Sequence, residues 1–368
     1  MDEYARQLQT LYASQWLSHA REVMSQPLKA TGPRTQRFLR VVASLSRTMD
    51  KYSASAGRER ALDAIDLGAI YAGVDARESL NNDNKLGYTD LVVLELLDYF
   101  KNHFFTWVNK PPCPQCHGEG DNMVATGGRP FPANAPNPDE IGAIETYKCQ
   151  QCNVDVEFPR IRNPVSLLKT RRGRCGEWVD CFVLILVALL DDPLKVRYVW
   201  NQEDHVWCEY YSDHLRRWVH LDPCEAAWDQ PLLYWQNWGK AMSYVLGFGT
   251  DYCIDLLPKY IDATKQIPQT EIVDSPKEVS DGIKYFAKYK LIDAYLMSGK
   301  PQTAITFYYD YLVPYNRELR LVAQAAAAGA EPALALGGAD EDGASAAPAG
   351  RQLGSAEWTR ARGESGPR

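Results

Sequence analysis

The fold is decided by the stretch RRGRCGEWVDCFVLILVALL at residues 171–190. Its apolar part, residues 182–190, is far too short to span a bilayer, and Asp191 follows it directly, so we expect a buried helix. Cys175 then stands at or near the helix N-terminus, where the helix dipole and free backbone amides stabilise a thiolate. Glycines on either side permit a tight turn and the close approach of a substrate. Taken alone, the stretch fits an unreactive buried cysteine better than a nucleophile.

Strand-like segments downstream supply partners for this cysteine. β-Branched and aromatic residues dominate 196–200, 206–211 and 218–221, which predicts an antiparallel meander. His205 opens the second segment and Asp222 ends the third, so adjacent strands can bring these two side chains together. Asp222 would hold the imidazole tautomer while His205 moves protons. His214 and His220 are rival bases, although a core or surface role suits both better.

A helix-borne cysteine facing His and Asp on an antiparallel sheet is the papain-like arrangement. We therefore expect an α+β fold and a Cys-His-Asp triad that cleaves an amide bond.

Two Cys-x-x-Cys pairs precede this region in a segment rich in Gly, Pro and Asn, with little apolar periodicity. Such a segment cannot build its own core and needs a staple. Four thiolates suit one tetrahedral zinc ion and leave no open position, so we expect a structural metal. A redox pair, unrelated buried thiols and a competing ligand, His117, are the alternatives. The four expected ligands are Cys113, Cys116, Cys149 and Cys152.

Composition limits the class of protein. The 368 residues carry 40 Lys+Arg against 47 Asp+Glu, a formal net charge of −7, which argues against general nucleic-acid binding. The chain opens on Met-Asp-Glu with no apolar run behind it, and no segment is long enough for a membrane span, so we expect a cytoplasmic protein. Nine cysteines in such a chain favour metal binding or catalysis over a disulfide framework.

Several motifs, in one order, resemble the cytoplasmic peptide:N-glycanases of the transglutaminase-like superfamily, in a lean fungal form. The resemblance covers roughly residues 8–255. Besides the cysteine pairs, the matching motifs are FTWVN (105–109), TRRGRCGEW (170–178), RYVW (197–200), DHVW (204–207), DPCE (222–225), PLLY (231–234) and WGK (238–240). After the nucleophile helix, residues 187–194 depart from the family pattern.

The resemblance implies a papain-like core with an inserted zinc-binding region, and hydrolysis of the bond between an Asn side chain and the first N-acetylglucosamine of a glycan. It makes Cys175 the nucleophile, His205 the base and Asp222 its orienting partner. It also implies three substrate-binding residues, whose alternative readings are a packing Trp, a solvated cross-strand Glu and a core Trp. They are Trp107, near the oxyanion and the sugar, Glu209, which binds the chitobiose core, and Trp238, which packs on the sugar.

The expected organisation has five parts. They are an N-terminal helical region of the core (1–105), a four-cysteine zinc-binding subdomain (106–160), a transglutaminase-like catalytic core (161–275), C-terminal helices (276–324) and a disordered tail (325–368). The resemblance further implies misfolded N-glycoproteins as substrates, a Rad23-type proteasome shuttle protein bound through residues 4–24 and the helices beyond 276, and a cytoplasmic or also nuclear location.

Two competing interpretations remain at this point. The chain could be another transglutaminase-like enzyme, a cysteine protease or an acyltransferase, but the cysteine pairs and the DHVW motif favour a glycanase. It could also be a non-catalytic scaffold for ubiquitin-pathway partners, against which the complete triad speaks.

Overall fold

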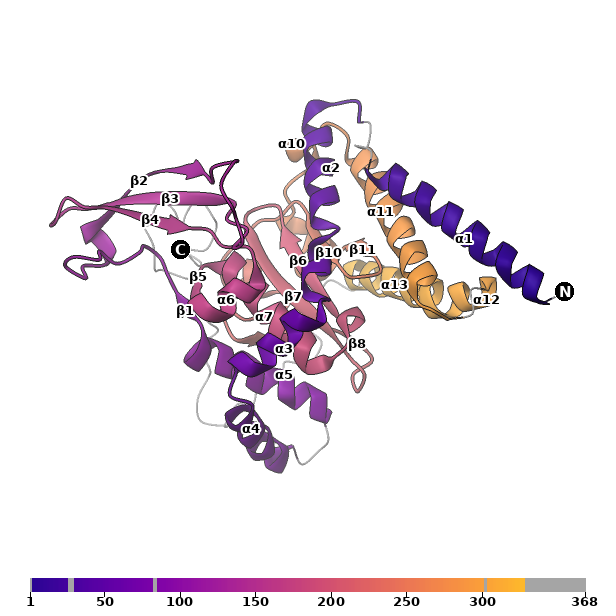
Figure 1. Cartoon of the computed structure of the whole chain (residues 1–368), viewed down its shortest axis with the longest axis horizontal. Coiled ribbons are helices and arrows are strands. Elements are labelled where there is room, and N and C mark those ends of the chain that lie inside the picture. Colours follow the sequence, from indigo (N-terminus) through magenta and orange to yellow (C-terminus); the bar gives the residue numbers. More distant parts are fainter. Residues whose placement is uncertain (1, 26–29, 82–84, 301–302, 328–368) are drawn as a thin grey trace. The chain divides into compact units, whose positions relative to one another are not determined.

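The computed structural model describes residues 2–25, 30–81, 85–300 and 303–327 (Figure 1). It separates into two compact units. The first takes its described residues from Met1–Asp50, Arg197–Glu203 and Ala241–Ala333, and the second from Lys51–Val196 and Asp204–Lys240. The tail expected at 325–368 lies outside the described residues from 328 onward, and 325–327 end helix α13 (Val313–Ala327).

The second unit holds the sequence segment that decides the fold. Helix α7 (Cys175–Leu190) is buried along most of its length and packs against strand β7 (His205–Ser212). Strand β7 pairs antiparallel with β8 (Arg217–Asp222), and β8 pairs antiparallel with β9 (Ala227–Trp228). A buried helix against antiparallel strands confirms the expected α+β class.

Helices surround this core within the same unit. They are α3 (Ser55–Ala64), α4 (Leu67–Leu80), α5 (Tyr88–Tyr99), the π-helical turn η2 (Phe100–Phe104), α6 (Pro164–Thr170) and the short α8 (Leu233–Gln236). Aromatic rings join η2 to α7: Phe100 lies edge-on to both Trp178 and Phe182, with centroids 5.5 and 5.3 Å apart. These edge-to-face contacts fix the face of α7 that the helices cover.

The departure at residues 187–194 has a local explanation. Asp191 ends α7 in the left-handed conformation (φ 50°), and the side chain of Asp192 accepts a hydrogen bond from the backbone N–H of Leu194 at 2.9 Å. That cap starts the single turn η4 (Pro193–Lys195). The chain therefore leaves the helix by a capped turn, and the residues of the nucleophile end are unaffected.

The inserted segment is more ordered than its sequence indicates. Strands β2 (Met123–Pro130), β3 (Ala143–Cys149) and β4 (Asp155–Pro159) form an antiparallel sheet in the order β2-β3-β4, preceded by the single turn η3 (Gly120–Asn122). A small apolar cluster lies at one end of this sheet, formed by Cys113, Met123, Tyr147, Cys149 and Phe158. The segment therefore does have a small core, and two of the cysteines expected as its staple, Cys113 and Cys149, are part of it.

The first unit contains the three antiparallel strands β6 (Val196–Asn201), β10 (Val245–Phe248) and β11 (Cys253–Asp255), in the order β11-β10-β6. Arg197 on β6 is fully buried and donates to Glu318 of α13 at 2.9 Å. This buried ion pair joins the C-terminal helix to the strands of the unit.

Long terminal helices complete the first unit. Residues 4–24 lie in α1 (Asp2–Ser25), and α11 (Pro276–Met297) is the first of the C-terminal helices expected from residue 276. Their rings Trp16 and Tyr289 stack with centroids 6.2 Å apart. The other elements are α2 (Pro33–Leu45), η1 (Thr48–Tyr52), α9 (Leu257–Tyr260), η5 (Ala263–Lys265), α10 (Gln269–Ile272), α12 (Ala304–Phe307) and η6 (Tyr308–Leu312). Within the described ranges, every helix lacks the combination of length and apolar character that crossing a membrane requires.

Candidate active site

The backbone around Cys175 is fixed by a cap at the start of α7. Cys175 is the first helical residue and is 5% exposed. Arg174 before it is extended, and its backbone N–H donates to the carboxylate of Glu177 at 3.0 Å. Gly173 makes room for this carboxylate, since a Cβ there would lie 2.3 Å from the Cβ of Glu177. The flanking glycine thus serves the cap of the nucleophile helix.

Trp107 is aligned with the nucleophile by a short strand pair. β1 (Thr106–Trp107) runs parallel to β5 (Arg172–Gly173), with Trp107 opposite Gly173. The indole N–H of Trp107 donates to the side-chain oxygen of Asn109 at 2.6 Å. The structure therefore brings Trp107 to the nucleophile end of α7, but it directs the indole N–H to Asn109.

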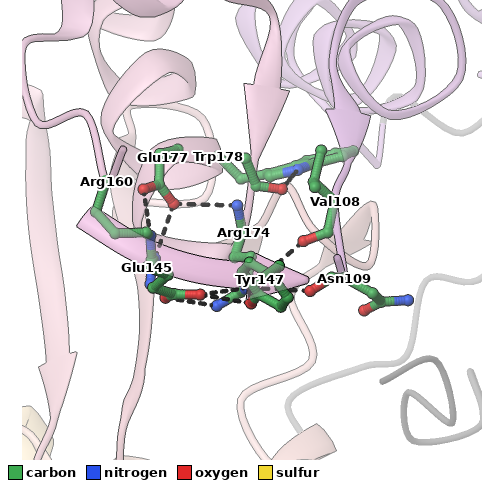
Figure 2. Close-up of polar contacts among 9 residues, drawn as sticks. Val108, Asn109, Glu145, Tyr147, Arg160, Arg174, Glu177 and Trp178 are labelled. Carbon is green, nitrogen blue, oxygen red and sulfur yellow. Dashed lines mark hydrogen bonds and ion pairs between the residues drawn. The ribbon is translucent and has the colours of Figure 1, made fainter. Parts of the chain in front are cut away.

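The side chain of Arg174 is buried in a network that holds the helix start (Figure 2). Its guanidinium donates to both oxygens of Glu145, at 2.8 and 2.7 Å, and to the hydroxyl of Tyr147 at 2.7 Å. It also donates to the carbonyls of Val108 and Asn109, at 3.0 and 2.9 Å. One side chain next to the nucleophile thus joins the β3 strand of the inserted sheet to the segment that follows β1.

A second arginine closes the network. Arg160 donates to both carboxylate oxygens of Glu177, at 2.7 and 2.9 Å, and to Glu145 at 2.9 Å. Burial works to raise the pKa of Glu145, but the hydrogen bonds from Arg174 and Tyr147 outweigh it and hold that pKa below its usual value. Glu145 therefore stays ionised near neutral pH, and the bidentate pairs keep a single geometry.

His205 and Asp222 meet as the strand order predicts. Nε2 of His205 lies 2.9 Å from Oδ2 of Asp222, and the side chains are 3% and 0% exposed. Burial works to lower the pKa of His205, but hydrogen bonds with Asp222 and Cys175 outweigh it and raise the pKa to about 9. His205 is therefore protonated at neutral pH and can serve as a proton donor.

Asp222 is held in turn by the chain that follows it. The backbone N–H of Cys224 donates to its Oδ1 at 2.9 Å. The Cys224 N–H thus binds one carboxylate oxygen while the imidazole lies at the other, which fixes the carboxylate plane. The structure thus brings Cys175, His205 and Asp222 into one hydrogen-bonded cluster, which is the geometry a cysteine triad requires.

A cavity of about 480 Å³ opens beside this cluster. It mixes aromatic faces with amide, ammonium and carboxylate groups, which suits a ligand that has an apolar face and several hydroxyls. Its lining consists of Lys101, Asn102, Phe105, Thr106, Trp107, Trp178, Cys224 and Glu225. Sequence reasoning missed Lys101, Asn102 and Glu225 as candidate contacts, although Glu225 ends the DPCE motif and η2 ends three residues before Trp107.

The other two expected sugar-binding residues lie deeper. Glu209 is fully buried on β7 opposite His220, so the alternative of a solvated cross-strand glutamate is wrong. Trp238 is 3% exposed and its ring lies edge-on to His205, with centroids 5.3 Å apart. Neither belongs to the lining of the cavity. Trp238 instead packs against the imidazole of His205.

Comparison with known proteins shows which family the chain resembles. The model of the transglutaminase-like superfamily matches residues 129–223, a range that contains all three triad residues. The peptide-N(4)-(N-acetyl-beta-glucosaminyl)asparagine amidase of Candida albicans is 42% identical over 99% of this chain and 92% of its own length. The protein of the same name from Debaryomyces hansenii is 44% identical over 90% and 87% of the two chains.

The chain belongs to the peptide-N(4)-(N-acetyl-beta-glucosaminyl)asparagine amidase family. The resemblance found in the sequence is thereby confirmed. Among solved structures, the crystal structure of Rad4-Rad23 bound to a 6-4 photoproduct UV lesion is 11% identical, with a TM-score of 0.41 over 75% of this chain and 62% of that chain. Similarity at this level assigns no partner to this amidase family member.

Four cysteines, in the loop after β1 and at or just after the end of β3, form the candidate metal centre of this amidase. Their sulfur atoms all lie within 4.8 Å of one another. Asn122 donates to the sulfur of Cys149 at 3.3 Å, and the backbone N–H of Cys152 donates to it at 3.4 Å. The Cys152 amide and the neighbouring thiols lower the pKa of Cys149 to about 6. Four convergent sulfurs with N–H donors are a donor set that fits a tetrahedral soft metal, and His117 is not part of the cluster.

Proposed function

We propose that this chain hydrolyses the amide bond between an asparagine side chain and the first N-acetylglucosamine of an N-linked glycan, with Cys175 as its nucleophile. The arrangement that carries the proposal is a cysteine at a helix start beside a buried His205–Asp222 pair. The family assignment supports the substrate class, since the relatives are named for this amidase activity.

The reaction follows from the positions of these groups. The Cys175 thiolate attacks the carbonyl carbon of the glycosylated asparagine side chain, and the backbone N–H of Cys175 stabilises the oxyanion. His205, protonated at neutral pH, gives its proton to the departing glycosylamine nitrogen, and a thioester remains. Neutral His205 then takes a proton from water, which attacks the thioester and releases aspartate. Asp222 keeps the imidazole oriented throughout.

The cavity beside the triad supports a sugar as the leaving part of the substrate. Trp107 and Trp178 offer ring faces for a pyranose, and Glu225 and Asn102 offer groups that bond hydroxyls. Glu209 and Trp238 are buried and lie outside the lining of the cavity, so they would act on the sugar only through the shape of the site.

We also propose zinc for the four-cysteine centre. Bound there, zinc would supply folding stability rather than chemistry, because four thiolates leave it no open position. Cys149 and Cys152 would hold it from the end of β3 and the turn beyond, and Cys113 and Cys116 from the loop after β1.

We infer misfolded N-glycoproteins as substrates, a Rad23-type shuttle as partner, and a cytoplasmic or also nuclear site of action. The surface for the partner would be α1 and α11, where Tyr4, Leu8 and Tyr12 are exposed. A pull-down with a Rad23-type protein, compared with the variant Leu8→Asp, tests the partner: equal capture by both chains contradicts this surface.

The function is tested on a denatured N-glycoprotein. The wild-type chain should remove the glycan and leave aspartate at the site, while Cys175→Ala should not. Cys181→Ala is the matched control, because Cys181 is a buried residue of the same helix. A folded wild-type protein that leaves the glycan in place, with rapid iodoacetamide labelling of Cys175, would favour another transglutaminase-like reaction. Slow labelling would favour a scaffold.

A further inference from the structure

Behind the triad, Asp222 has a second side-chain partner. The hydroxyl of Tyr234 donates to Oδ2 at 3.1 Å, the same oxygen that lies 2.9 Å from Nε2 of His205. With the Cys224 N–H on Oδ1, the carboxylate accepts hydrogen bonds on both oxygens. Tyr234 and Asp222 are both fully buried, so the tyrosine contact lies in a dry environment where hydrogen bonds are strong.

The chain of hydrogen bonds continues to His220. Its Nε2 lies 2.7 Å from the Tyr234 hydroxyl, and its Nδ1 accepts a hydrogen bond from the backbone N–H of Gln230 at 3.3 Å. A backbone N–H can only donate, so Nδ1 carries no proton, and a neutral imidazole then carries it on Nε2. His220 therefore donates to the tyrosine oxygen, which directs the tyrosine proton to Asp222.

Packing keeps these groups in register. The Tyr234 ring stacks on Trp207 with centroids 4.4 Å apart and lies edge-on to His205 at 5.1 Å. His220 is fully buried, opposite Glu209 in the strand register. The tyrosine ring is thus held by two residues of β7, one of which is His205 itself.

We propose that Tyr234 and His220 are positioning residues of the reaction, forming a one-directional hydrogen-bond chain His220→Tyr234→Asp222 that sets the charge and orientation of the triad carboxylate. This rests on the proposed function of the triad. Tyr234 spreads part of the carboxylate charge, which tempers the attraction of Asp222 for the His205 proton. His220 keeps the tyrosine proton pointing at the carboxylate.

Removing the tyrosine hydroxyl should change the pKa of His205 in one direction only, upward. In Tyr234→Phe, Asp222 loses a donor and attracts the imidazolium proton more strongly, so the pKa of His205 rises further from its value of about 9. His205 then gives its proton to the leaving amine less readily, and kcat falls about tenfold with little change in KM. The other titratable groups near the pair, Cys175, Cys208 and Glu209, are unchanged in the variant.

The experiment combines kinetics with nitrogen NMR of histidine-labelled protein, which needs no activity. We expect His220 to show the neutral Nε2–H tautomer in the wild type, and the His205 titration to move up by about half a unit or more in Tyr234→Phe. His220→Gln, whose amide can both accept from Gln230 and donate to Tyr234, should keep kcat within about threefold of wild type. His220→Leu should lose about as much as Tyr234→Phe.

Exposed His214, on the β7–β8 turn, provides the control: His214→Gln should match the wild type. The proposal is overturned if His220 carries its proton on Nδ1, or if Tyr234→Phe folds and leaves both kcat and the His205 titration unchanged. A shifted titration in a chain with no amidase activity would instead keep the hydrogen-bond chain and reject the proposed function.

Discussion

Glu145 of the inserted sheet should contribute measurably to holding the nucleophile end of α7. Glu145→Gln keeps the side-chain size but removes the charge that faces Arg174 and Arg160 (Figure 2). Breaking a buried pair by removing one partner costs about 3–5 kcal/mol. The Glu145 side chain is 23% exposed, and Arg174 keeps the Tyr147 hydroxyl and two carbonyls, so we expect a loss of about 2 kcal/mol.

Such a loss should lower the Tm by about 4–8 °C, measured by circular dichroism. It should also slow iodoacetamide labelling of Cys175, because the side chain of the preceding Arg174 loses its ion pair with Glu145 and is held less firmly. Glu157→Gln is the matched control: Glu157 lies on β4 and pairs with Arg129, but both side chains are about half exposed, so we expect less than about 0.5 kcal/mol. Equal Tm values for the two variants would refute the reasoning.

Three further outcomes follow from the site. Because hydrogen bonds with Asp222 and Cys175 outweigh burial and raise the pKa of His205 from 6.5 to about 9, its contribution to stability is complete below about pH 6.5 and is lost as the pH rises through about 9. Asp222→Asn should flatten that part of a Tm-against-pH curve, and an unchanged curve contradicts the ion pair. A strong chelator should lower the Tm of the wild type, since metal binding is folding free energy, and an unchanged Tm rejects the structural metal. Asn109→Ala removes the side-chain oxygen to which the Trp107 indole N–H donates. We expect kcat to change by less than about threefold, because the proposed oxyanion donor is the Cys175 backbone N–H, and a larger gain contradicts that assignment.

The meeting of Cys175, His205 and Asp222 was predictable because each of these residues stands at the end of a locally encoded element. Cys175 precedes an uninterrupted apolar run, His205 opens a strand-like segment and Asp222 closes the next one, and the register of β7 with β8 aligns them. These are short-range signals, and the motifs around them identified the family.

The contacts that hold the site in place were not predictable, since they join residues that are far apart in the sequence. All of β2 after Met123 is exposed, so its sequence has no apolar alternation that could mark a strand. The contact between Arg174 and Glu145 depends on where the inserted sheet lies, and no local sequence pattern encodes that position. Glu209 is buried only because β7 lies inside the unit. The apolar neighbours of His220 predicted its burial, but its bond to Tyr234 needed the fold.

The central claim is that Cys175 forms a thioester with the asparagine side chain of the glycopeptide. Rapid acid quenching of the wild-type chain with excess N-glycopeptide, followed by peptide mapping, tests it directly. We expect a transient adduct on Cys175 whose mass is that of the peptide without its glycan, absent from Cys175→Ala. Aspartate formation by Cys175→Ala at the wild-type rate, or an adduct on another residue, would contradict it.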